Sequence, residues 1–319
     1  MPQRFPFWRQ TPPAIFPVTL GFMGLGLAWR NASQILGISH EIGDLLLGVS
    51  TAYMVWFLSL YFLKALSRPS VVFEDLRIPP NRAGVASVPM SVMLLAAALL
   101  PFNVHVPEVW WVGVVLQFLA ITLVTIVILR DPPEMRAFSP FQYLSYVGPV
   151  VAPIAGIPLG FATESLWLAF FALAAFVVIT IGYAAKLIRV RPPVPLRPSL
   201  AIILAPSGLL ALTFAQQDWP VLFLIFYALS WLIALTLLFA ARWLIAGGWT
   251  PMWGSFTFPI AVFTNMQVEA ANHGMERVAI IGIWLGLSIG TPLILFIVYK
   301  ATMAWIQGDL AKKTGAVMA

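Results

Sequence analysis

Side chains that could carry out acid–base, nucleophilic or metal chemistry are scarce in this chain of 319 residues. Only 9% of the residues are charged, cysteine is absent, and the three histidines, His40, His105 and His273, are far apart. No HExxH, GxSxG or phosphate-loop pattern is present, and the spaced glycines of GLGLAW (24–29) follow no predicted strand. We therefore expect no enzyme, no cofactor, no metal site and no nucleic-acid partner.

The pattern that stands out is a recurring set of prolines and small residues. Pro17 shares a helical face with Gly21 and Gly24, because residues three, four and seven apart lie on one side of a helix. Similar sets recur four times along the chain. Their members are Ser87 and Pro89; Pro149, Ala152, Pro153 and Gly156; Pro206 and Gly208; and Gly254, Pro259 and Ala261. Phe258 is the one bulky side chain in the row that contains Gly254 and Ala261.

The elements that carry these residues are apolar and long enough to cross a bilayer. The chain is 61% hydrophobic, and its charged fraction is far below the roughly 25% of a soluble domain. It lacks the alternating pattern of a membrane β-barrel. We predict an all-α integral membrane protein with ten transmembrane helices. They cover roughly residues 15–30, 43–65, 83–101, 107–129, 141–161, 165–187, 198–215, 220–243, 251–269 and 277–303.

The distribution of charge supports this count and gives an orientation. With ten helices, all but two of the 18 Lys and Arg residues fall on one side of the membrane, Arg30 and Arg277 being the exceptions. Cytoplasmic loops are rich in Lys and Arg, so both termini are expected in the cytoplasm of a cell inner (plasma) membrane protein. We expect short tails at 1–14 and 305–319 around a transmembrane domain at 15–304. The N-terminal residues lack a small-residue cleavage site, so no removable signal peptide is expected.

Prolines inside the predicted helices fall almost entirely in the odd-numbered ones, with Pro292 in the tenth as the exception. This predicts five helical hairpins, each with a proline-kinked helix and a straight one. Small residues can serve helix packing alone. Alternatively, proline and small residues face a water-filled conduit. Recurrence in all five odd helices favours the conduit, with an inner ring of five kinked helices around a pore and an outer ring of five. Phe258 would then block the pore, since apolar constrictions can gate by dewetting.

Three stretches carry a resemblance to a known family. FPVTLGFMGLGLAW (16–29), LAPSGLL (204–210) and WGSFTFPIAVFTN (253–265) resemble the tellurite-resistance/dicarboxylate transporter (TehA-type) family, which is related to plant guard-cell slow anion channels. The resemblance implies a homotrimer in which each subunit has its own pore, closed by a phenylalanine of the ninth helix. That position is Phe258 in this chain. Pro17 departs from the family, in which a glycine is usual at this place.

We predict a gated passive anion channel with an uncharged pore, embedded in a lipid bilayer and conducting small inorganic or organic anions. The prediction that the conducted ions are anions depends mainly on the resemblance. One alternative is a secondary carrier, a uniporter or exporter, for dicarboxylate (C4-dicarboxylate), sulfite or tellurite-like oxyanions. No ionisable residue lies at the centre of a predicted helix, which argues against proton coupling but not against a uniporter. A further alternative is a non-transporting membrane subunit of a larger complex.

Overall fold

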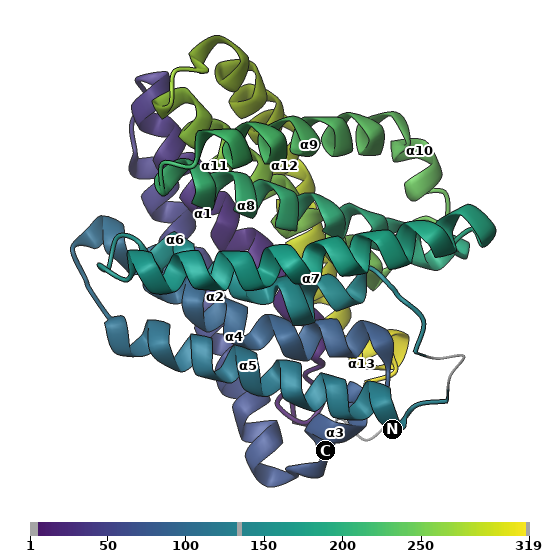
Figure 1. Ribbon diagram of the computed structural model, residues 1–319. Helices are drawn as coiled ribbons and strands as arrows, with labels where there is room; N and C mark the ends of the chain where they lie inside the picture. Colours follow the sequence, from purple (N-terminus) through teal and green to yellow (C-terminus); the bar gives the residue numbers. More distant parts are fainter. Residues whose placement is uncertain (1–5, 133–135, 317–319) are drawn as a thin grey trace.

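The computed structural model describes residues 6–132 and 136–316, and every regular element within these ranges is helical (Figure 1). Two longer stretches are not regular α-helix. In the first, a π-helix (η4, Tyr143–Val147) is followed directly by a 3-10 helix (η5, Gly148–Val151), and in the second a 3-10 helix (η6, Val194–Ile203) precedes α8. Short 3-10 helices also lie at η1 (Pro13–Ile15), η2 (Leu100–Phe102) and η7 (Pro251–Trp253). The main α-helices are α1 (Phe16–Leu36), α2 (Glu41–Ser67), α4 (Pro79–Leu99), α5 (Pro107–Arg130), α7 (Ala162–Arg189), α8 (Leu204–Gln216), α9 (Pro220–Phe239), α11 (Gly254–Asn272) and α12 (Glu276–Ile306). The shorter α-helices are α3 (Ser70–Leu76), α6 (Pro153–Gly156), α10 (Ala241–Leu244) and α13 (Asp309–Thr314).

Seven helical stretches in the described residues are both long enough and apolar enough to cross a membrane. They are Glu41–Ser67, Pro79–Phe102, Pro107–Arg130, Ala162–Arg189, Val194–Gln216, Pro220–Phe239 and Glu276–Ile306. The segment Tyr143–Gly156 is apolar but shorter. Helices α1 and α11 lie outside this group although they are of comparable length, because glycine, threonine and asparagine replace large aliphatic side chains in them. The structure is therefore an all-helical, multi-pass membrane protein.

Burial separates two kinds of helix. The apolar windows of α5, α7 and α9 are 28%, 28% and 22% buried, whereas those of α4 and of the 194–216 segment are 72% and 89% buried. Nearly every residue of α1 from Phe16 to Ala28 is also buried. Helices α1 and α4 and the 194–216 segment thus lie inside, and α5, α7 and α9 lie outside, where large apolar side chains remain exposed to lipid.

The buried helices contact one another in sequence around the interior. Helix α1 packs against α4 and α11, α11 packs against α8, and the 143–156 segment packs against both α4 and α8. Outer helices cover this group: α2 and α12 pack on α1, α5 on α4, and α9 on α8. Figure 1 shows α4 and α5 side by side, with α7 running across the 143–156 segment.

The prolines differ in their effect on the backbone. The α-helix is continuous across Pro89 in α4 and Pro259 in α11, so these helices keep their other hydrogen bonds around one lost donor. Between 143 and 156 the helix instead changes to π and then 3-10 geometry, where Pro149 and Pro153 follow each other closely. The sequence pattern treats all five proline sites alike, but among them only Pro149 lies in a stretch, 143–151, that departs from α-helix.

The two described ends of the chain meet. The indole of Trp305, near the end of α12, donates a hydrogen bond to the hydroxyl of Thr11 over 3.1 Å. The ring of Phe7 also packs at a tilt against Trp305, with ring centroids 4.9 Å apart. The N-terminal segment and the end of α12 therefore lie on the same side of the helical domain.

Candidate functional site

Two cavities lie within the group of buried helices and meet at Phe258. The first, which we call the apolar chamber, has a volume of about 60 Å³. The second, the polar cavity, has a volume of about 320 Å³. Phe258 and Leu209 line both of them. Phe258 is 7% exposed, so neighbouring residues cover its ring almost completely.

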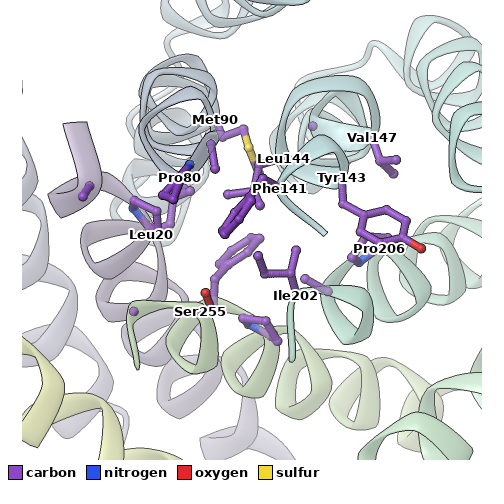
Figure 2. Close-up of a pocket in the computed structure, with 18 of the residues that line it drawn as sticks. Leu20, Pro80, Met90, Phe141, Tyr143, Leu144, Val147, Ile202, Pro206 and Ser255 are labelled. Carbon is purple, nitrogen blue, oxygen red and sulfur yellow. The ribbon is translucent and has the colours of Figure 1, made fainter. Parts of the chain in front are cut away.

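The apolar chamber is enclosed by side chains of five chain segments (Figure 2). Leu20 of α1, Phe141 and Ile202 project into it in Figure 2. No charged residue is among those that line it. Tyr143 contributes its ring, while its hydroxyl lies 2.8 Å from the Thr180 hydroxyl of α7. The lining of the chamber is therefore mostly apolar and carries no charge.

The polar cavity has a different chemistry. Asn31, Gln34, Gln216, Asn265, Glu269 and Asn272 all line it, and Glu269 is the one carboxylate among the lining residues. The Asn31 amide donates to Asn265 over 3.0 Å, and the Asn265 amide in turn donates to the carbonyl oxygens of Gly24 and Ala261. The Gln216 amide donates to the Glu269 carboxylate over 3.1 Å. This cavity could therefore hold water or a solvated ion.

Contacts between α1 and α11 fix the position of Phe258. The Thr257 hydroxyl lies 2.9 Å from the Pro17 carbonyl oxygen and 2.8 Å from that of Gly254, so its one proton is shared between the two helices. A Cβ on Gly21 would overlap the Thr257 side chain and lie 2.6 Å from the backbone nitrogen of Phe258. A Cβ on Gly24 would lie 2.9 Å from that of Ala261 and 3.5 Å from the Phe258 ring. These glycines allow α11 to approach α1 closely.

The residues singled out in the sequence divide into two groups. Those that line one of the two cavities are Pro17, Gly24, Pro206, Gly254, Phe258 and Pro259. The others are absent from both linings: Gly21, Ser87, Pro89, Pro149, Ala152, Pro153, Gly156, Gly208 and Ala261. A pore-lining role for this second group stays a prediction.

Several members of the second group have packing contacts. The Ala152 carbonyl oxygen accepts a hydrogen bond from the Trp110 indole over 2.8 Å, and a Cβ on Gly156 would lie 2.7 Å from the same indole. A Cβ on Gly208 would lie 2.8 Å from Val262. Small residues at these places bring helices together, as the packing interpretation of the pattern expects.

Sequence patterns missed Leu209, Phe141 and most polar residues of the second cavity, although Asn265 shares the helical face of Gly254 and Ala261. Leu209 is one of many leucines, and Phe141 precedes the π-helix rather than lying in a row of small residues. Gln216, Asn31 and Glu269 come from three different helices. No local spacing could have joined them.

Within the described residues, no group of three or more His, Asp or Glu side chains could hold a metal ion.

Comparison with known proteins gives a family for this architecture. Residues 10–304 match the family model described as voltage-dependent anion channel (SLAC1). A 113-residue stretch is also 27% identical to the tellurite resistance protein TehA homolog of Haemophilus influenzae, covering 35% of this chain and 34% of that relative. The matched stretch thus spans about a third of the relative's length. Since the family model covers nearly the whole chain, the protein belongs to the family of voltage-dependent anion channels.

Proposed function

We propose that this protein is a gated, passive anion channel whose pore passes through the polar cavity and the apolar chamber and is closed by Phe258. The observation that carries the proposal is the position of this ring, which lines both cavities and is almost fully buried between them. Membership of an anion channel family supplies the class of ion. An apolar ring of this size at a narrow point excludes water, and a dry constriction blocks ions.

In this proposal ten transmembrane helices form five hairpins. Helices α1, α4, α8 and α11 and the 143–156 segment form the inner ring, and α2, α5, α7, α9 and α12 the outer ring. Two observations support it. The inner elements contact one another in the order α1, α4, 143–156, α8, α11 and back to α1. The outer helices α5, α7 and α9 are the least buried.

The lack of charge in the apolar chamber affects which anions the proposed pore would conduct. An ion that enters it must shed much of its water, which costs least for large, weakly hydrated anions. The excess of Lys and Arg predicted for the cytoplasmic side would raise the local anion concentration, within a screening length of about 8 to 10 Å. We therefore propose a preference for weakly hydrated monovalent anions over strongly hydrated ones.

We further propose that the protein is a homotrimer in the cell inner membrane, with cytoplasmic N- and C-terminal tails at 1–14 and 305–319. The contact of Thr11 with Trp305 supports placing both tails on one side. The bias of Lys and Arg toward that side supports calling it cytoplasmic. The trimer is proposed from the family resemblance. The outer helices expose many apolar side chains, which are available to contact lipid and other subunits.

Current–voltage measurements on reconstituted protein, with chloride, nitrate, sulfite and malate in turn, test this function. A channel gives currents that follow the electrochemical gradient of each anion. Transport that saturates at low concentration and is driven by a proton gradient would contradict the proposal and favour a carrier. Purified protein that carries no anion and copurifies with a larger complex would favour a non-transporting subunit.

A further inference from the structure

A third cavity, which we call the basic cavity, adjoins the apolar chamber. Its volume is about 250 Å³, and it lies between the start of α4, the end of α5, residues 137–145 and the end of α7. Pro80 and Ala83 line the apolar chamber, whereas their neighbours Pro79 and Arg82 line the basic cavity. The two spaces therefore lie on opposite sides of one wall.

Phe141 belongs to this wall and lines both cavities. Its side chain is 7% exposed, the same as that of Phe258. In Figure 2 its ring projects into the apolar chamber. The π-helix Tyr143–Val147 begins two residues later, and such distortions are frequent at functional sites. The chamber thus has an aromatic ring toward the polar cavity and a second one toward the basic cavity.

The lining of the basic cavity is mixed, with five polar or charged residues among apolar ones. Arg82, Lys186, Ser139, Gln142 and Ser145 contribute to it. Arg82 is 6% exposed and is held by an ion pair with Asp131 and by a bond to the Leu76 carbonyl oxygen. The Lys186 ammonium donates to the Phe138 carbonyl oxygen over 3.2 Å, and no ion pair between described residues involves it. Asp131 balances Arg82, so the net positive charge comes from Lys186, an exposed residue at the edge of the cavity.

One buried donor in this cavity lacks a partner. The Ser145 side chain is 1% exposed, and its hydroxyl has no hydrogen-bond partner among the described residues. A buried hydroxyl without a partner costs free energy, so such groups are normally satisfied by a ligand or by water. A hydroxyl, an ammonium and a guanidinium around one space form a donor set that suits an anion with several oxygen atoms.

We propose that the basic cavity binds a small oxoanion at the cytoplasmic end of the pore, and that Phe141 is a second barrier between this site and the apolar chamber. The assignment of the cytoplasmic end and of the barrier rests on the proposed channel function. Anion binding in the cavity does not, because it follows from the donors alone. The site would hold an anion close to the pore before Phe141 moves aside.

Crystals of the full chain grown with selenate test the site without any current. We expect anomalous difference density for selenium within hydrogen-bond distance of the Ser145 hydroxyl. The density should be lost in the Lys186→Gln/Ser145→Ala variant and kept in Arg189→Gln, a matched variant of an exposed cation near the end of α7 that does not line the cavity. No density in the cavity of the wild-type protein, or equal density in the double variant, would overturn the proposal.

Currents of the Phe258→Ala protein test the second barrier. We expect Phe141→Ala in this background to raise the anion current several-fold further. Lys186→Gln should raise the half-saturating anion concentration several-fold when the anion is supplied from the cytoplasmic side, and leave it unchanged from the opposite side. If Phe141→Ala leaves the current unchanged, Phe141 is not a barrier. If Lys186→Gln leaves the half-saturating anion concentration on the cytoplasmic side unchanged, the site plays no part in conduction. Absence of current in Phe258→Ala itself would refute the channel proposal instead. The selenate crystals would still show whether the basic cavity binds an oxoanion.

Discussion

The Thr257 hydroxyl lies 2.9 Å from the carbonyl oxygen of Pro17 and so joins α11 to α1 one residue before Phe258. The Thr257 side chain is fully buried, so no water can replace this bond without a rearrangement. The aromatic ring proposed as the gate is therefore carried by a backbone that is fixed to the neighbouring helix.

Thr257→Val removes this hydroxyl and keeps the shape of the side chain. We expect the free energy of unfolding to fall by about 0.5 to 1.5 kcal/mol, which is the usual net contribution of one hydrogen bond to stability. The Pro17 carbonyl oxygen, left without this donor, should lower it further. Thr264→Val is the matched control, because the Thr264 hydroxyl bonds only the Ile260 carbonyl oxygen of its own helix. Equal losses for the two variants, measured by unfolding in detergent, would show that the bond between helices contributes nothing.

Gly21→Ala tests the close approach of α1 and α11. The new Cβ would meet the Thr257 side chain and the Phe258 backbone, and overpacking of this kind costs about 1 to 3 kcal/mol. Gly48→Ala is the control, since a Cβ on Gly48 in α2 meets nothing within 4 Å and alanine favours a helix by up to about 1 kcal/mol. We expect the Gly21 variant to unfold at a lower temperature than wild type, and the Gly48 variant at the same or a higher one. A Gly21 variant as stable as wild type would contradict this packing.

The buried ion pair of Lys64 and Asp75 gives a third prediction. Their side chains are both fully buried, with the charged atoms 3.6 Å apart. Lys64→Met removes the ammonium that faces the Asp75 carboxylate, and breaking a buried pair costs about 3 to 5 kcal/mol. The double variant Lys64→Met/Asp75→Leu should recover most of the loss.

The exposed pair of Lys313 and Asp309 serves as the control for this measurement. Lys313→Met should cost less than about 1 kcal/mol, because solvent screens the interaction. If the double variant at 64 and 75 were less stable than Lys64→Met alone, the ion pair would not be the cause of the loss.

Glu269→Gln tests whether the polar cavity lies on the conduction path. Glu269 is the one carboxylate among the residues that line this cavity, and its charge repels anions there. We expect neutralisation to lower the half-saturating anion concentration on the polar-cavity side by about 2- to 10-fold, or up to about 1.4 kcal/mol. Glu276→Gln, at the exposed start of α12, should change nothing. If wild type, Glu269→Gln and Glu276→Gln have the same half-saturating anion concentration, the polar cavity does not lie on the conduction path.

Much of the helical arrangement could be predicted from the sequence. Long apolar runs such as FLIFYALSWLIALTLLF in α9 predict a membrane helix from composition alone. Helices α1 and α11 are less apolar, and the glycines at 21, 24 and 254 were the better signal for them, because helices packed inside a bundle need small residues more than large aliphatic ones.

Other features depend on the tertiary structure and left no local signal. A proline removes one donor wherever it stands, but whether the helix continues depends on its neighbours. The helix continues at Pro259 and changes geometry around Pro149. The basic cavity brings together Arg82, Phe141 and Lys186, which are far apart in the sequence and belong to no periodic row. Their proximity follows only from how α4, α7 and the 137–145 segment pack.

The anion current of Phe258→Ala in proteoliposomes tests most directly whether Phe258 closes an anion pore. Phe263→Ala is the matched control, because Phe263 lies on the same helix, is 6% exposed and packs edge-on against Trp231 of α9 rather than lining either pore cavity. We predict that Phe258→Ala conducts several-fold more than wild type, while Phe263→Ala stays at the wild-type level. Background current in both wild type and Phe258→Ala, with equal amounts of folded protein in the membrane, would contradict the claim that this ring closes an anion pore.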